Sequence, residues 1–335
     1  MKKTLHLLLA IVLLVCTASA QELTWAQLVK QPEHWPAQCT MKKALEFESG
    51  KRVAVGQQVD ILEIHSTEIV VGTSGISFGT SPADTDALAV ANAAYAKLTP
   101  AQRALTFASL LQRRDLWPYR VTLIEPIDLG NERIPAGAKA VLLGVEKNEL
   151  SLLWEKSRTG FELDVKLTDL LAQARTFVAD KTTIPSRVAE ELQGKLVDPL
   201  TGKAAPLDPK ALPRYYAFYR GGAYCPYTRE MTPSIVTFYK ETKAAHPEFE
   251  LIYVPTDKTA AELQAYAKQE SFPWRVVAFE EARKFPVLAP YFGPVPHFIV
   301  VDPAGNKLME CTATDRGPLL ERLTALLSTP VEPKK

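Results

Sequence analysis

The chain has 335 residues and a formal net charge of +1, with 47% apolar and 23% charged residues. This balance is typical of folded globular domains, and the length allows two or three of them. A charge so close to zero excludes a general electrostatic attraction to nucleic acid or to an anionic membrane surface.

The first twenty residues have the pattern of a secretory signal peptide. Two lysines precede the apolar stretch 5–15, and Ala18-Ser19-Ala20 forms a small-x-small cleavage site. The apolar stretch is too short to span a bilayer stably. We therefore expect cleavage after Ala20, export to a periplasm or beyond, and no stable membrane insertion afterwards. Lipidation at Cys16 is the second interpretation.

Residues 21–115 are predicted to form a small β-barrel with appended helices. Alternating segments at 41–48, 51–64 and 68–78 are separated by glycine turns, which is typical of short antiparallel strands. Helices are expected at 23–30, 87–98 and 100–114, since each begins near a capping residue or a proline.

The same pattern recurs after about 82 residues. Trp35-Pro36 matches Trp117-Pro118, and Thr85-Asp86 matches Thr168-Asp169. An internal repeat is therefore predicted, with a second barrel and its helix at 116–182. Both copies resemble bacterial Src-homology-3-like barrels, which implies a binding or spacing role toward a partner that the sequence does not identify.

Residues 183–213 have the proline content of a linker, with a lead-in hairpin near Leu196-Val197. From 214 to 328 strands alternate with helices, and a tight turn joins the last two strands. This order predicts an α/β domain with a mixed sheet flanked by helices. The expected strands are 215–219, 249–254, 276–279, 297–302 and 307–312, and the expected helices are 226–245, 259–270, 280–288 and 315–327.

Cys225 is the strongest candidate for a reactive atom. It follows a strand that ends in Gly221-Gly222, and Pro226 after it suits the first turn of a helix. The N–H groups at a helix start favour a thiolate, which is the nucleophilic form of cysteine. The competing interpretation is an inert buried thiol.

The segment 224–228, with Thr232-Pro233 in the next turn and Val295-Pro296 before an apolar strand, resembles the thioredoxin superfamily. The similarity is greatest to its tryparedoxin- and nucleoredoxin-like branch and extends over about residues 190–328. It implies that Cys225 is redox-active and that Pro296 is cis and faces it. It further implies substrate contacts from Tyr224, Pro226, Val295 and His297.

Thr228 stands where the motif has its second cysteine. Threonine cannot resolve a mixed disulfide, so the dithiol reaction of the family is not expected from this motif alone. Two roles remain open for its hydroxyl. It either hydrogen-bonds a Cys225 thiolate or caps the helix.

Cys311 and Cys39 are the candidate resolving thiols. Cys311 lies on the last strand, beside the expected place of Pro296, and Cys39 lies in the first barrel, where the second copy has Val121. A buried core position is the alternative for both. The thiolates of Cys225 and Cys311 and the imidazole of His297 are ligand types that suit copper(I) or zinc. Their spacing does not indicate a metal site, so neither a metal nor a cofactor is expected.

These observations predict an exported protein that exchanges thiols and disulfides through the single nucleophile Cys225. Its partners would be protein or low-molecular-weight thiols and disulfides, with no nucleic acid. The missing second cysteine leaves open whether the protein is an enzyme. The alternative is a non-catalytic binding or scaffold protein with a thioredoxin-like fold, and a soft-metal carrier is less favoured.

Overall fold

The computed structural model describes residues 22–180, 186–315 and 317–329, so the expected signal peptide at 1–20 lies outside the described residues. The chain divides into two compact units, Met1–Arg103 and Ala104–Lys335. The first unit contains one sheet domain, residues 22–103. The second contains another sheet domain, residues 104–180, and a C-terminal domain, residues 186–329. Within the described residues no helix combines the length and the apolar character needed to cross a bilayer.

The first sheet domain is built on four antiparallel strands in the order β1-β4-β5-β6, with β2 and β3 forming a separate hairpin. Helix α2 buries Ala87 and Ala91 in the core, and Thr24 and Gln27 form a capping box that begins α1. The elements are α1 Trp25–Lys30, β1 Gln38–Thr40, β2 Leu45–Glu46, β3 Arg52–Val53, β4 Gln58–Ile64, β5 Ile69–Thr73, β6 Ile76–Thr80 and α2 Ala87–Ala96.

The second sheet domain repeats this arrangement, with strand order β7-β10-β11-β12 and the hairpin β8-β9. In each domain the aspartate before the long helix accepts a hydrogen bond from the first strand. Asp86 accepts from the Thr40 N–H at 2.6 Å, and Asp169 accepts from the Thr122 N–H at 2.7 Å. The elements are α4 Phe107–Leu110, β7 Arg120–Thr122, β8 Ile127–Asp128, β9 Arg133–Ile134, β10 Lys139–Glu146, β11 Glu149–Trp154, β12 Thr159–Asp164 and α5 Leu170–Ala179.

The prediction of a single helix at 100–114 is wrong. The structure has two short helices there, α3 Pro100–Arg103 and α4, followed by a 3-10 turn at Arg114–Leu116. Thr106 begins α4 with a capping box to Ser109, so the chain starts a new helix rather than continuing the old one.

The C-terminal domain has a six-stranded mixed sheet in the order β13-β16-β15-β14-β17-β18. The central strand β14 pairs in parallel with β15 and antiparallel with β17. The strands are β13 Leu196–Val197, β14 Tyr215–Gly221, β15 Phe249–Pro255, β16 Arg275–Val277, β17 His297–Val301 and β18 Lys307–Thr312, and the helices are α6 Arg187–Leu192, α7 Pro226–Thr242, α8 Ala260–Glu270 and α9 Leu319–Ser328. The mixed sheet with helices is the predicted α/β domain.

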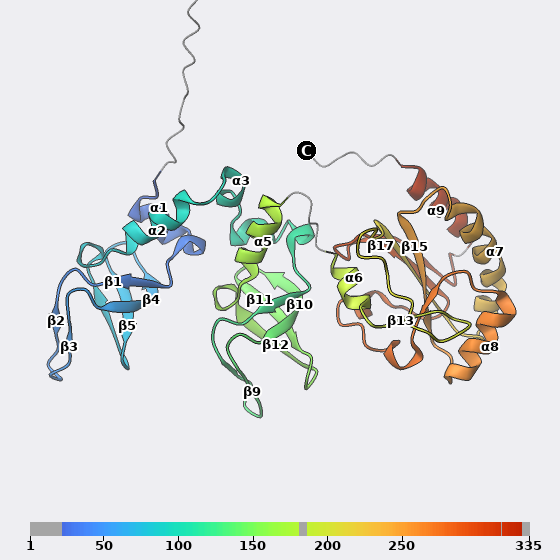
Figure 1. The fold of residues 1–335 in the computed structure, drawn as a ribbon, viewed down its shortest axis with the longest axis horizontal. Helices are drawn as coiled ribbons and strands as arrows, with labels where there is room; N and C mark the ends of the chain where they lie inside the picture. The colour runs from blue at the N-terminus through green and yellow to red at the C-terminus, as the bar shows by residue number, and fades with distance from the viewer. Residues whose placement is uncertain (1–21, 181–185, 316, 330–335) are drawn as a thin grey trace, which may run out of the picture. The chain divides into compact units, whose positions relative to one another are not determined.

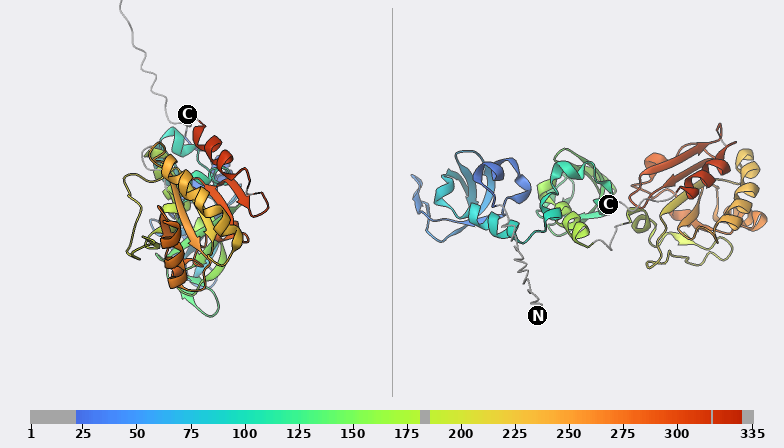
Figure 2. Two further views of the ribbon diagram at one scale, coloured as in Figure 1. Left: turned by 90° about the vertical axis from the view of Figure 1, so that its right-hand side faces the viewer. Right: turned by 90° about the horizontal axis from the view of Figure 1, so that it is seen from above.

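Alternate residues of β14 point to opposite faces of this sheet, and each face has its own core. Tyr215, Ala217 and Tyr219 belong to the core that α7, α8 and α9 cover, while Tyr216 and Phe218 belong to the core with α6. The helices can be followed on the two sides of the sheet in Figures 1 and 2. Because both faces are covered, all residues of β15 are buried, as expected for a central strand.

The prediction of a helix at 280–288 is also wrong. Only a 3-10 turn, Phe279–Glu281, forms in that segment, with another at Ala289–Tyr291. Pro286 lies inside the segment and has no N–H to donate, which disfavours a helix there. The backbone N–H groups of Val287 and Leu288 donate instead to the carboxylate of Glu191 on α6.

Helix α6, Arg187–Leu192, lies in the segment whose proline content predicted a linker, and it buries four of its six residues. Ser186 caps it by accepting the Ala189 N–H at 3.1 Å. Arg187 of α6 donates to the backbone oxygen of Leu142 in β10, so α6 connects the two domains of the second unit. In the segment of the expected lead-in hairpin the chain turns back, with Val197 bridging to Ala204 and the Asp198 N–H donating to the Lys203 oxygen at 2.8 Å, while β13 pairs with β16.

Candidate functional site

Cys225 lies where strand β14 ends and helix α7 begins. The Cys225 backbone N–H donates to Gly222 O at 3.0 Å, which closes the turn. Cys225 is the N-cap residue of α7. Pro226 occupies the first helical position, where no N–H is needed. The predicted placement of Cys225 at a helix N-terminus is confirmed.

The thiol of Cys225 is held against the loop before β17. Its Sγ lies 3.8 Å from the backbone oxygen of Val295, and the Val295–Pro296 peptide bond is cis, as the family resemblance implies. Cys225 is only 7% exposed, whereas Tyr224 on one side is 53% exposed and Tyr227 on the other is 47% exposed. A small buried thiol therefore stands in the chain between two residues whose aromatic rings are accessible.

Tyr224 folds back over the glycine turn. A Cβ on Gly222 would lie 2.6 Å from Tyr224 Cε1, so the ring occupies space that only a glycine leaves open. The Tyr224 hydroxyl lies 3.3 Å from Thr256 Oγ1. These contacts give the exposed ring a defined place beside Cys225, together with the exposed Pro226 that was also predicted to contact a substrate.

Thr228 is completely buried beneath the first turn of α7. Its Oγ1 has no hydrogen-bond partner among the described residues, and Cys225 has no side-chain capping bond. Neither of the two roles considered for this hydroxyl is observed. Its methyl group packs on Gly221, where a Cβ would come within 2.6 Å of Thr228 Cγ2.

A cluster of buried hydroxyl groups lies behind this turn. Tyr219 on β14 and Tyr266 on α8 both contact Thr232 Oγ1, at 2.9 Å and 2.7 Å. The ring of Tyr253 on β15 packs edge-on against that of Tyr219, and its own hydroxyl is buried without a partner among the described residues. Burial is the main reason why the pKa values of these tyrosines are raised.

Asp257 adds a buried carboxylate to the same region, and the sequence prediction missed it. Its Oδ1 accepts the Ala223 N–H at 2.7 Å, while its Oδ2 is buried without a partner among the described residues. Burial raises the pKa of this carboxyl above its ordinary range. A signal existed in the sequence, because β14 and β15 are parallel and Asp257 follows the end of β15, at the edge where Cys225 follows β14.

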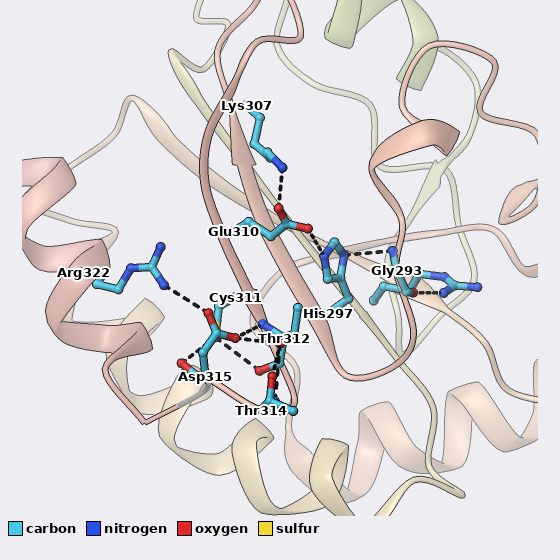
Figure 3. Close-up of polar contacts among 10 residues, drawn as sticks. Gly293, His297, Lys307, Glu310, Cys311, Thr312, Thr314, Asp315 and Arg322 are labelled. Atoms are coloured by element: carbon cyan, nitrogen blue, oxygen red, sulfur yellow. Dashed lines mark hydrogen bonds and ion pairs between the residues drawn. The ribbon is translucent and has the colours of Figure 1, made fainter.

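His297 was expected to contact a substrate, but its side chain is 1% exposed. Figure 3 shows its ring between the chain at Gly293 and the carboxylate of Glu310. Gly293 N–H donates to Nδ1 at 3.3 Å, which leaves Nε2 as the nitrogen that donates to Glu310 Oε1 at 2.9 Å. Arg220 also donates to the Gly293 oxygen, so these side chains hold the loop that carries Val295.

The other two cysteines lie in cores, and among the described residues no disulfide joins Cys39, Cys225 or Cys311. Cys311 on β18 is fully buried, with its Sγ 3.4 Å from the backbone oxygen of Asp315. Cys39 is buried in the first sheet domain, where burial raises the pKa of its thiol to about 11. Neither position supplies a thiolate ready to resolve a disulfide at Cys225.

Over residues 22–180, 186–315 and 317–329, no group of three or more His, Cys, Asp or Glu side chains is placed to hold an ion. His297 uses both ring nitrogens in hydrogen bonds to Gly293 and Glu310. The geometry therefore gives no support to the soft-metal alternative.

Comparison with known proteins assigns the domain that carries this site. A sequence model described as thioredoxin-like matches residues 213–307. The C-terminal domain is a thioredoxin-like domain. Probable nucleoredoxin 1 from Arabidopsis thaliana is 30% identical over 89 residues, which are 26% of this chain and 15% of that protein. Nucleoredoxin from Mus musculus is 30% identical over 90 residues, 26% of this chain and 20% of that protein.

The thioredoxin-like domain therefore corresponds to a fifth or less of the length of these two relatives. Among solved structures, tryparedoxin I from Leishmania major is 21% identical, covering 43% of this chain and 99% of that chain with a TM-score of 0.35. The predicted similarity to the nucleoredoxin-like branch agrees with the two nucleoredoxins.

Proposed function

We propose that this chain is an exported protein that exchanges thiols and disulfides through the single nucleophile Cys225. The observation that supports this most directly is the placement of Cys225 at the start of α7, with its Sγ 3.8 Å from Val295 O in the loop before β17. A disulfide lying along that loop would place one sulfur within reach of the thiolate, with Tyr224 and Tyr227 beside it.

In the proposed reaction the Cys225 thiolate attacks one sulfur of a substrate disulfide. The substrate S–S bond breaks, a new S–S bond joins Cys225 to one half, and the other half leaves as a thiolate that takes up a proton. A second thiol, from a protein or a small molecule, then attacks this mixed disulfide and releases Cys225. Thr228 cannot take that step, so the mixed disulfide is long-lived unless an external thiol is present.

Two further parts of the proposal rest on the sequence. Export is inferred from the signal-peptide pattern before Gln21. The two sheet domains are proposed to be Src-homology-3-like barrels that recognise or position a partner. Support for the second point comes from their identical strand order and from the equivalent hydrogen bonds of Asp86 and Asp169.

One observation favours the non-catalytic alternative, in which the domain only binds a partner. Cys225 is 7% exposed, whereas reactive cysteines usually lie in partly exposed sites. The two candidates differ in what a disulfide reagent does to the reduced mature chain.

The test is to mix the reduced mature chain with oxidised glutathione and to follow covalent adducts by mass spectrometry. We expect one adduct, located at Cys225, which is lost in Cys225→Ser and persists until a reducing thiol is added. A chain that gains no adduct at Cys225 would refute the exchange function and leave the binding module.

Thr228→Cys provides the matched gain-of-function variant. The new thiol would stand three residues after Cys225 in the first turn of α7, where it can attack the mixed disulfide. We expect the glutathione adduct to disappear without added thiol, leaving a disulfide between residues 225 and 228. An adduct as persistent as in the wild type would show that the first turn of α7 does not present the two sulfurs to each other.

A further inference from the structure

The loop of residues 293–296, just before β17, is held by side chains from two neighbouring strands. The Gly293 N–H donates to His297 Nδ1 at 3.3 Å, and the Gly293 oxygen accepts from Arg220. Arg220 on β14 and His297 on β17 pair directly in the sheet, so both side chains approach one glycine from adjacent positions. The loop also carries the Val295 oxygen, which lies 3.8 Å from Cys225 Sγ. The bonds to Gly293 therefore hold the part of the site that faces the thiol.

The hydrogen bonds of the His297 ring require its neutral form. Because the Gly293 N–H is a donor, Nδ1 must be an acceptor without a proton, and Nε2 carries the proton that it donates to Glu310 at 2.9 Å. A second proton at Nδ1 would turn that acceptor into a donor and break the bond to Gly293. The ring is buried, and a Cβ on Gly293 would lie 3.3 Å from His297 Cδ2, so the ring fits closely against the backbone.

The charged groups around this ring decide how readily it takes up a proton. Glu310 on β18 contacts the ring, and Lys307 on the same strand bonds to the other oxygen of the Glu310 carboxylate (Figure 3). The bonds from Lys307 and His297 hold the pKa of Glu310 below its ordinary range, so the carboxylate stays ionised in mildly acidic solution. It provides a counter-charge for a protonated His297 ring. The positive charges of Lys307 and of Arg220 on β14 oppose that protonation.

We propose that His297 is a pH-dependent positioning residue for the exchange reaction: its neutral ring holds the 293–296 loop against Cys225, and protonation of the ring releases the loop. The proposal rests on the exchange function proposed above and adds a condition to it. Reaction with a disulfide in an extended peptide requires the neutral ring, because the peptide lies along the loop. Reaction with a disulfide that carries no chain does not require it. Histidine is the side-chain type whose charge most often changes between pH 5 and pH 8, which sets the range to be measured.

The experiment compares two reagents with the same reacting bond on the full mature chain. Both carry a cysteine joined to thionitrobenzoate, one within an extended glycine-rich hexapeptide and the other in N-acetylcysteine amide. The Cys225 thiolate attacks the cysteine sulfur, a new S–S bond joins Cys225 to that cysteine, and thionitrobenzoate leaves as a coloured thiolate. The ratio of the two rates cancels the ionisation of Cys225, since both reactions use the same thiolate. We expect the peptide to react about five- to tenfold faster at pH 8, and the two rates to lie within about twofold of each other at pH 5.

Two replacements of His297 separate its two hydrogen bonds. In His297→Asn the amide oxygen stands where Nδ1 was and accepts the Gly293 N–H at every pH, so the preference for the peptide is expected to persist from pH 8 to pH 5. In His297→Gln the longer amide reaches Glu310 but not Gly293, so the preference is expected to be lost at every pH. A purely structural role would change both variants, and both reagents, alike.

Glu310→Gln keeps an acceptor for the ring and removes the counter-charge. The fall in the rate ratio should then occur at lower pH, because a neutral amide favours the protonated ring less than a carboxylate does. His246→Asn is the matched control, since His246 also contacts a glutamate, Glu248 at 3.1 Å, but lies beyond the C-terminal end of α7, whereas Cys225 lies at its start. Its rate ratio should follow that of the wild type at every pH.

The two proposals fail in different ways. If neither reagent reacts faster with wild type than with Cys225→Ser, the exchange function is wrong and the role of His297 is wrong with it. If both reagents react through Cys225 but their rate ratio does not change with pH, or if His297→Asn and His297→Gln behave alike, only the positioning role of His297 is wrong.

Discussion

Replacing Gly221 by alanine should destabilise the thioredoxin-like domain, because the new methyl group has no room. Its Cβ would lie 2.6 Å from Thr228 Cγ2 and 3.1 Å from Tyr253 OH, and both side chains are fully buried. Overpacking of this kind costs about 1–3 kcal/mol. The alanine also reduces the conformational entropy of the unfolded chain, which stabilises the folded state by about 0.4–1 kcal/mol. We expect a net loss of about 1–2 kcal/mol in the free energy of unfolding.

Gly222→Ala is the matched control. Its Cβ would lie 2.6 Å from Tyr224 Cε1 and 2.9 Å from Thr256 Oγ1. The Tyr224 ring is half-exposed and can rotate into solvent, and Thr256 Oγ1 ends a side chain that is only half-buried. We expect this variant to lose about 1 kcal/mol or less, and less than Gly221→Ala. The assay is urea unfolding followed by hydrogen exchange of the β14 amides, which reports on this domain alone. A Gly221→Ala variant as stable as wild type, or an equal loss in Gly222→Ala, would refute this account of the packing.

Three shorter predictions concern charged and sulfur groups. Glu250→Ala should lower the free energy of unfolding by about 2 kcal/mol, because this buried carboxylate bonds to a lysine at 3.0 Å and an arginine at 2.6 Å; an unchanged urea midpoint would contradict it. Burial raises the pKa of Glu191 from 4.5 to about 7, so the folded chain holds that proton more tightly and stability falls as pH rises from about 4.5 to 7. Glu191→Gln should flatten this fall in unfolding measurements between pH 5 and pH 8. Cys39 should resist iodoacetamide at pH 8 in the folded chain, since the pKa of its thiol is raised to about 11; modification as fast as that of a free thiol would show an open core.

The sheet of the thioredoxin-like domain could be predicted because its strands are continuous apolar runs. β14, β15 and β17 are buried on both faces, and β18 has the predicted bounds Lys307–Thr312. The predictions of helices at 100–114 and 280–288 were wrong for local reasons. In the first segment the capping residue Thr106 begins a new helix. In the second, Pro286 has no backbone N–H to donate.

The chemistry of the site was only partly predictable. Cys225, Pro226 and Pro296 are found from a short motif and its spacing, and the structure places them as expected. His297 and Asp257 are different, because their surroundings come from distant strands. The partners that bury the His297 ring include Glu310 on β18, and Asp257 approaches Ala223 only when β14 and β15 pair. The sequence alone does not give the distance between Asp257 and Ala223, because that distance depends on how the strands pair.

The pattern of buried polar groups argues for retained chemistry rather than a scaffold. A domain that only binds a partner would be more stable with apolar side chains in place of Thr228 Oγ1, Tyr253 OH and Asp257 Oδ2, since each unpaired atom costs about 1–3 kcal/mol. Local rules of this kind are broken mainly at functional sites. Arg187, Glu191 and Trp274 of the same domain also have such atoms, but Thr228, Tyr253 and Asp257 lie around the turn between β14 and α7. In the proposed exchange, Thr228 takes the place of a second cysteine, so the resolving step must come from another thiol, while Cys225 keeps its place at the start of α7.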